Sequence, residues 1–202
     1  KTAEAISEEL QKEVERIVGE CLKEQRHPRM DLEAIEFYVR DSMHEVGRLL
    51  LERVLNADGA GYRGSSIRCD MDHCCKYVED REKEVVTVLG PIRVERSYYY
   101  DKKCENGICP RDAELDIEGT GFSPGVRRMM ARVGALRPFG QGQDDIQELA
   151  GVKVTAKDIE RICHDLGQKV EEFYRQNVII GKPVKTLYRC MEGKGKPMQR
   201  RE

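Results

Sequence analysis

The stretch EKEVVTVLGPIRVERSYYYD, residues 82–101, decides the fold class, because every second position carries an apolar or bulky residue on both sides of a turn signal. These positions are Val85, Thr87 and Leu89 in the first half and Ile92, Val94, Arg96 and Tyr98 in the second. A period of two residues is typical of a half-buried strand, and the segment LGPI, residues 89–92, indicates a turn. The stretch therefore predicts a β-hairpin in a chain whose other long segments have helical patterns.

Residues 2–26 and 31–56 carry apolar side chains at helical spacing, and Asp31 is the expected N-cap of the second segment. Two amphipathic helices joined by a short turn form a helical hairpin. Each apolar stripe is wide enough for two uses, mutual packing of the helices or a dimerisation and partner-binding arm. The glycine-rich segment NADGAGYRGSS, residues 56–66, follows as a linker.

A second helical region begins at Ser123, an expected N-cap followed by Pro124 at the first helical position. Thr155 is the expected N-cap of the last helix, with Asp158 as the acid of a capping box. The expected elements here are a loop over 110–125, a helix over 125–136, a break at RPFGQGQ (137–143), a helix over 144–150, a turn at GVKV (151–154), a helix over 155–176, and a strand from about Val184.

Composition restricts the class of protein. The 202 residues are 39% hydrophobic and 36% charged, without Trp, which favours a mostly helical, well-solvated protein over one large core. The apolar runs are too short to span a membrane, and no signal peptide precedes the first helix. The sequence therefore predicts a cytoplasmic protein with no membrane partner, in which the eight cysteines are not expected to form disulfides.

Four cysteines flank the predicted hairpin in two pairs. Cys69 and Cys74 bracket DMDH, and Cys104 and Cys109 bracket ENGI, so a hairpin between the pairs would bring them together. Four thiolates around zinc would stabilise a β-unit too small to have its own core. Cys75 and His73 are additional candidates. The alternative is a set of reduced thiols without a metal.

The segment DDIQELAGVKVTAKDIERICHDL, residues 144–166, resembles a helix-turn-helix. Its expected interior positions are Ile146, Leu149, Val154, Ile159 and Ile162. In that unit the second helix enters the major groove of DNA, and the candidates for contact are Lys153, Thr155, Lys157, Asp158, Arg161 and His164. Asp158 and Glu160 repel phosphate, so an ordinary helical hairpin is the alternative.

Arginines are concentrated between residues 122 and 137, a stretch without any acid. The group consists of Arg127, Arg128, Arg132 and Arg137. Arg128 and Arg132 share a helical face at a spacing of four residues, which suits contacts to the DNA backbone. A solvated helix face is the alternative. No nucleophile constellation accompanies this group, and the segment GKGKP lacks the spacing of a phosphate-binding loop.

The order of these pieces resembles the N-terminal half of bacterial DDE transposases of the Kra insertion-sequence family. The resemblance runs from about Cys69 to the end and is carried by the TVLGP turn, the R.YY strand, the C.RD segment and the ELAGV.V helix junction. It implies a zinc-binding β-unit and a helical DNA-binding unit before an RNase H-like catalytic domain. The family's two C-x2-C pairs match Cys69 with Asp72 and Asp101 with Cys104, so two thiols are replaced by carboxylates.

The resemblance also implies that the chain has lost catalysis. The family's first catalytic aspartate lies in a motif like MDGTGVP, and this sequence has MEGKGKP with Glu192 at the aspartate position. Glu is one methylene longer than Asp, which disturbs a site that holds two metal ions a few ångströms apart. The later catalytic carboxylates are expected to be missing, and residues 181–202 are interpreted as the first strand of that domain.

The sequence thus predicts an α+β fold, mostly α, with a helical hairpin over 1–57, a zinc-ribbon-like β-hairpin unit over 58–118 and a helix-turn-helix-like unit over 119–180. The expected function is that of a mobile-element-derived DNA-binding subunit or regulator in a bacterial nucleoid-associated complex. Its expected partners are duplex DNA and, through residues 1–57, a protein or a second copy, without a small-molecule substrate. The alternatives are a protein-binding adaptor, whose arginine face meets an acidic protein or a guide RNA complex, and the ordered part of an active transposase.

Overall fold

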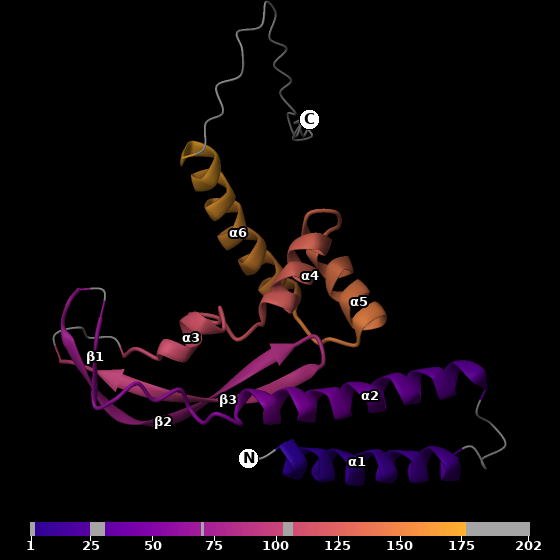
Figure 1. Cartoon of the computed structure of the whole chain (residues 1–202). Coiled ribbons are helices and arrows are strands. Elements are labelled where there is room, and N and C mark those ends of the chain that lie inside the picture. The colour runs from indigo at the N-terminus through magenta and orange to yellow at the C-terminus, as the bar shows by residue number, and fades with distance from the viewer. Residues whose placement is uncertain (1–2, 25–30, 70, 103–106, 177–202) are drawn as a thin grey trace, which may run out of the picture.

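The computed structural model describes residues 3–24, 31–69, 71–102 and 107–176, and they form a mostly helical α+β fold, as predicted (Figure 1). Two N-terminal helices, a three-stranded antiparallel sheet and C-terminal helices follow one another along the chain. The elements are α1 (Ala3–Glu24), α2 (Leu32–Leu55), β1 (Ser66–Arg68), β2 (Cys74–Thr87), β3 (Gly90–Tyr100), α3 (Pro110–Glu114), α4 (Pro124–Gly134), α5 (Phe139–Ala150) and α6 (Ala156–Gln176).

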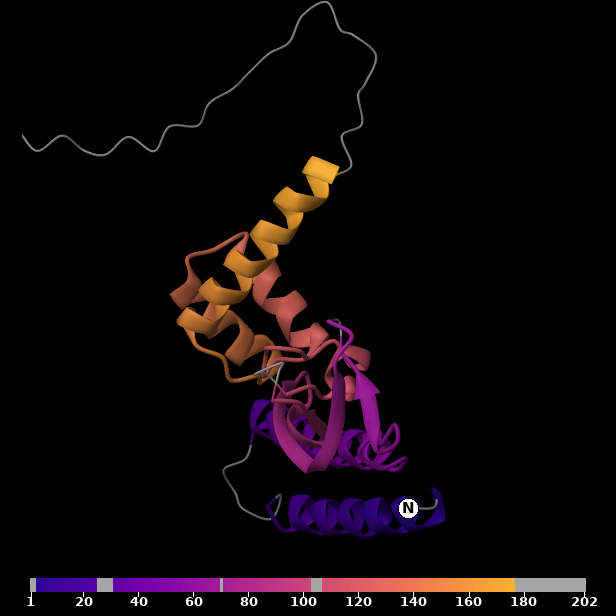
Figure 2. The same cartoon turned by 90° about the vertical axis from the view of Figure 1, so that its left-hand side faces the viewer.

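The elements are stacked along one direction of the molecule. Figure 2 shows α1 at one end, then α2 and the sheet together at one level, and then the helices α4 to α6, with the last turns of α6 projecting from the opposite end. No helix in the described part of the chain is both long and apolar enough to cross a membrane.

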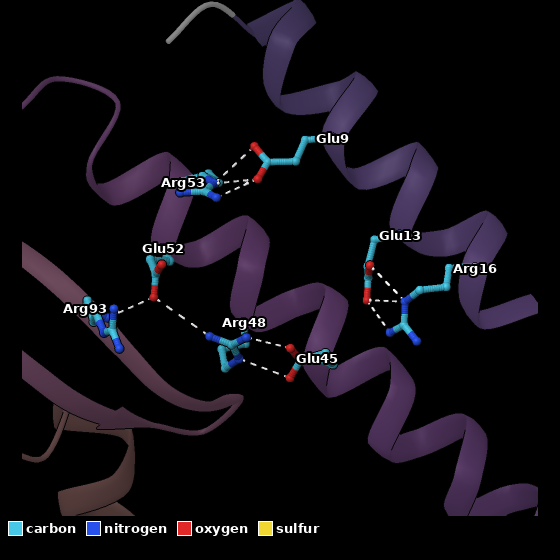
Figure 3. A network of polar contacts seen from close by, with 8 residues as sticks. All are labelled: Glu9, Glu13, Arg16, Glu45, Arg48, Glu52, Arg53 and Arg93. Carbon is cyan, nitrogen blue, oxygen red and sulfur yellow. Dashed lines mark hydrogen bonds and ion pairs between the residues drawn. The ribbon is translucent and has the colours of Figure 1, made fainter. Parts of the chain in front are cut away.

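Helices α1 and α2 form the predicted antiparallel hairpin. The expected N-cap is confirmed, since the backbone N–H of Ala34 donates to Asp31 Oδ1 over 2.9 Å. Arg53 of α2 forms a two-pronged ion pair with Glu9 of α1, with 2.5 Å between Nη2 and Oε1 (Figure 3). Since α1 also buries Ile17 almost completely, the two helices pack against each other, which is the first of the two expected uses.

Helix α2 also holds the sheet. Its Glu52 carboxylate accepts the backbone N–H of Arg93 over 2.9 Å and lies 3.8 Å from Arg48 (Figure 3). The side chain of Asn56, the C-cap of α2, donates to the carbonyl of Arg93 and accepts the N–H of Glu95. One apolar cluster also holds α2 against the sheet. Its members are Leu51, Leu55, Val85, Ile92, Val94, Leu115 and Ile117.

The β-hairpin is confirmed, but its turn lies earlier than LGPI. Thr87 and Gly90 are paired, so the turn consists of the two residues between them, Val88 and Leu89. The Thr87 hydroxyl donates to the Gly90 carbonyl over 2.7 Å and accepts the N–H of Leu89. Gly90 has a φ of +113°, which an L-residue rarely adopts, and this fixes where the returning strand begins.

The expected alternation along β3 ends after Val94. Beyond that point Ser97 and Tyr99 are the buried residues, whereas Tyr98 is half-buried and stacks under Arg81. A register shift near Tyr77 accompanies the change. Residues 60–65 of the linker lie against this part of β3. The Ser97 N–H donates to the Ala60 carbonyl over 2.8 Å at the free edge of the strand, and the Tyr99 hydroxyl donates to the Gly64 carbonyl.

The segment expected to be a loop over 110–125 contains the short helix α3. Pro110 stands at its first position, where its missing N–H costs nothing, and Asp112 lies in its first turn. The Asp112 carboxylate, largely buried, accepts Arg96 Nη1 over 2.7 Å and Lys83 Nζ over 3.3 Å. Because these cations come from β3 and β2, α3 is attached to the sheet.

Helices α4, α5 and α6 pack against one another around a separate apolar cluster. Its buried members are Phe122, Val126, Met130, Ile146, Val152, Val154, Ile159 and Ile162. The Ser123 N-cap is confirmed by its bond to the Val126 N–H. The expected break over 137–143 is wrong in its second part, because α5 begins at Phe139 and includes Gly142, which is buried next to Val133 of α4.

Candidate nucleic-acid interface

The turn between α5 and α6 is held at both ends. Gly151 ends α5 in a left-handed conformation with a φ of +66°. The predicted capping box is present, since Thr155 Oγ1 accepts the Asp158 N–H over 3.1 Å and Asp158 Oδ2 accepts the Thr155 N–H over 3.2 Å. Gln143 of α5 accepts the N–H of Ala156, which fixes the start of α6 against α5.

Four of the five interior positions expected for this unit are buried, and Leu149 is the exception, with 80% of its surface exposed. In α5 the residues Gly142 and Ile146 are buried and Ala150 is half-buried. This row, spaced by four residues, faces the core, so Leu149 lies off it and points to solvent. The prediction for Leu149 is therefore wrong.

The four arginines of the 122–137 stretch do not form one group. Arg127 is largely buried, and its guanidinium lies 2.7 Å from Asp116 Oδ2 and 2.5 Å from the Asp116 carbonyl oxygen. Arg137 Nε pairs with Asp145 Oδ2 over 2.9 Å and so links the α4–α5 connection to α5. Arg128 and Arg132 are exposed, and neither forms an ion pair within the described ranges. The pair at i and i+4 is thus the accessible part of the arginine group.

The candidates at the start of α6 also differ from one another. Lys157 is exposed and makes no ion pair with any residue that the structure describes. Arg161 is exposed but pairs with Asp158 over 3.0 Å, and His164 lies 3.9 Å from Asp165. The Thr155 hydroxyl donates to Asp158 Oδ2 over 2.6 Å, which occupies it in the cap.

Lys153, the candidate in the turn itself, lines a groove between the turn and α2. The opposite wall includes Arg40 and His44 of α2 and Leu89 at the tip of the β-hairpin. Arg40 Nη1 donates to the Glu148 carbonyl over 3.3 Å, at the C-terminal end of α5 where the helix dipole favours a cation. The N-terminal hairpin and the helical unit are therefore in contact at the turn.

The first cysteine pair surrounds a tight turn. Asp72 has a left-handed φ of +59°, and its N–H donates to the Cys69 carbonyl over 2.8 Å. The His73 N–H donates to Cys69 Sγ over 3.3 Å. Cys74 is exposed at the start of β2, whereas Cys75 is fully buried against Tyr99.

The second pair is described only through Cys109, because Cys104 lies outside the described residues. Cys69 and Cys109 line the same pocket, together with Asp112. Burial raises the pKa of the Cys109 thiol above its ordinary value, and nearby Arg96 partly opposes this. No three donors among residues 3–24, 31–69, 71–102 and 107–176, including the half-buried Asp101, are close enough to hold a metal. A zinc site that includes Cys104 therefore stays a prediction.

The chain matches no protein-family model, and a search of curated proteins finds no sequence significantly similar to it. The resemblance to transposases therefore stays a prediction from the motifs between Cys69 and the C-terminus. Residues 181–202, with Glu192, lie outside the described residues, so the expected terminal strand and its degenerate catalytic position stay predictions as well.

Proposed function

We propose that residues 123–176 bind duplex DNA and that the protein is a transposase-derived DNA-binding subunit or regulator without catalytic activity. The observation that carries the proposal is the α5–turn–α6 unit. In it a capped helix starts after a short turn, next to Lys153 and Lys157, which are exposed and make no ion pair with any described residue. A helix presented in this way is what helix-turn-helix proteins place in the major groove. The resemblance of residues 123–166 to the DNA-binding part of Kra-family transposases points the same way.

The accessible cations have two roles in this proposal. Arg128 and Arg132 contact phosphates, which gives affinity without sequence information. Lys157 and Arg161 lie in the first turns of α6, where side chains reach base edges. Arg161 exchanges its bond to Asp158 for DNA, whereas Arg127 keeps its contact with Asp116 and does not take part.

Salt-dependent binding of a fluorescent duplex tests the proposal. In the Arg128→Ala/Arg132→Ala variant, binding weakens for all sequences, and the slope of log K against log salt falls by about 2 in magnitude. Arg175→Ala is the matched control, because this exposed arginine at the far end of α6 pairs with Glu171 and should leave the slope unchanged. The absence of measurable binding to any duplex in low salt would refute the proposal.

The second candidate is a protein-binding scaffold. It is favoured by the net charge of −2 and by Glu160, an exposed acid among the cations of α6 that repels phosphate. A scaffold would bind its acidic protein partner through the arginine face and would not bind duplex DNA even in low salt. The Arg128→Ala/Arg132→Ala variant would then lose the protein association, with no duplex binding to lose.

A further inference from the structure

Helix α2 has three sides, and two of them are occupied within the chain. Arg53 and Tyr38 mark the side that meets α1, through Glu9 and Glu20 respectively. Leu51 packs on the sheet from the second side. The third side begins with Leu32, which is 71% exposed in the first turn. Further along it carries four large apolar residues with 43%, 47%, 42% and 55% of their surface exposed, and these are Val39, Met43, Leu50 and Val54. We call these four residues the α2 strip.

The order of the α2 strip is symmetric. Successive members are separated by four, seven and four residues, so these four read the same in both directions about a midpoint between Val46 and Gly47. Leu32 continues the side beyond this symmetric part at its N-terminal end only. A two-fold axis needs this property, because residue i of one copy must meet residue j of the other and the reverse. Pairing with an unrelated partner does not require such symmetry.

We propose that α2 packs antiparallel against α2 of a second copy about a two-fold axis at this midpoint, and that the protein is a homodimer. Val39 of one copy then faces Val54 of the other, and Met43 faces Leu50. No charged residue belongs to the strip, so the contact requires no buried ion. The spacing of four and seven residues is that of an apolar seam between two helices.

The exposed area is of the size that a dimer uses. Val14 and Val18 of α1, with 37% and 50% of their surface exposed, add apolar surface to the arm. With them the strip exposes on the order of 400 Å² per copy, close to the apolar share of the roughly 800 Å² that each partner buries in a standard interface. An apolar patch of this size equals the largest one on a typical monomer, and such patches are often functional.

Sedimentation equilibrium of the full chain without DNA, at about 1 to 100 µM, tests the dimer. We expect a dimer in the native protein and a rise of about 100-fold or more in the dissociation constant for Met43→Glu, because each dimer buries two such charges. Leu149→Glu is the matched control, because Leu149 is more exposed than Met43 but lies on α5, outside the α2 strip. The dissociation constant of the Leu149→Glu dimer should equal that of the native protein. Circular dichroism confirms that each variant keeps its helices.

A pair of double variants tests the antiparallel register. Met43→Lys/Leu50→Glu and Met43→Glu/Leu50→Glu remove the same apolar side chains, but only the first places opposite charges across the proposed axis. We expect the first to dimerise about tenfold more tightly, since like charges in direct contact oppose association. Equal dissociation constants would overturn the register.

A native protein that stays monomeric at the highest concentration would overturn the dimer itself. If Met43 were then also protected from oxidation by peroxide, another part of the same chain would cover the strip. These measurements involve no DNA, so a failure of the dimer and a failure of DNA binding are told apart.

Discussion

Two glycines in α5 should respond to alanine in opposite directions. A Cβ atom at Gly142 would lie 3.0 Å from Val133 Cγ2 and 3.2 Å from Val133 Cβ, whereas one at Gly140 meets no atom within 4 Å. Alanine adds up to about 1 kcal/mol of helix stability at either site, and less near the helix start. At Gly142 overpacking costs about 1 to 3 kcal/mol, because Val133 Cβ cannot move unless α4 moves.

We therefore expect Gly142→Ala to lower the free energy of unfolding by about 1 kcal/mol and Gly140→Ala to raise it by about 0.5 kcal/mol. At about 2 to 4 °C per kcal/mol for a chain of this size, the two melting temperatures should differ by about 5 °C in a thermal unfolding experiment. Equal stabilisation by both alanines would show that α4 and α5 are not closely packed at residue 142.

Three further changes test the parts that position the candidate site. Asp112→Ala removes the partner of two largely buried cations and should cost about 3 kcal/mol in urea unfolding, whereas Glu114→Gln, in an exposed pair on the same helix, should cost less than about 1 kcal/mol. Thr155→Ala should cost about 1 kcal/mol and raise hydrogen exchange in the first turn of α6. The hydrogen bond from Arg48 lowers the pKa of Glu45, so its stabilisation is present above about pH 4.3 and is lost at lower pH as the carboxyl is protonated. The stability difference between native protein and Glu45→Gln should therefore vanish in acid, and a difference that persists there would contradict the assignment.

Features that depend on neighbouring residues could be predicted from the sequence. The three N-caps at Asp31, Ser123 and Thr155 are such features, because each is a bond between a side chain and a backbone N–H three residues later. The β-hairpin was also predictable, since its alternation extends over both strands. The exact turn was not, because the pairing of Thr87 with Gly90 outweighs the general turn tendency of Gly-Pro.

Features that depend on distant segments could not be predicted in this way. The glycines of RPFGQGQ suggest a break, but the close approach of α4 favours a glycine at residue 142 within a helix. Tyr99 rather than Tyr98 is the buried tyrosine, because the Tyr99 hydroxyl binds the linker at the Gly64 carbonyl. Arg127 looked equivalent to Arg128 in the sequence, and only its contact with Asp116 separates the two.

Helix α2 connects the parts of the molecule on which both proposals depend. It binds α1 through Arg53, the sheet through Glu52, and the end of α5 through Arg40. A two-fold axis through α2 would therefore relate two complete helical units as well as two arms. Dimers of helix-turn-helix units read two half-sites related by the same symmetry as the protein. If both proposals hold, the DNA that binds most tightly should contain inverted half-sites, and Met43→Glu should weaken binding to such DNA more than binding to a single half-site.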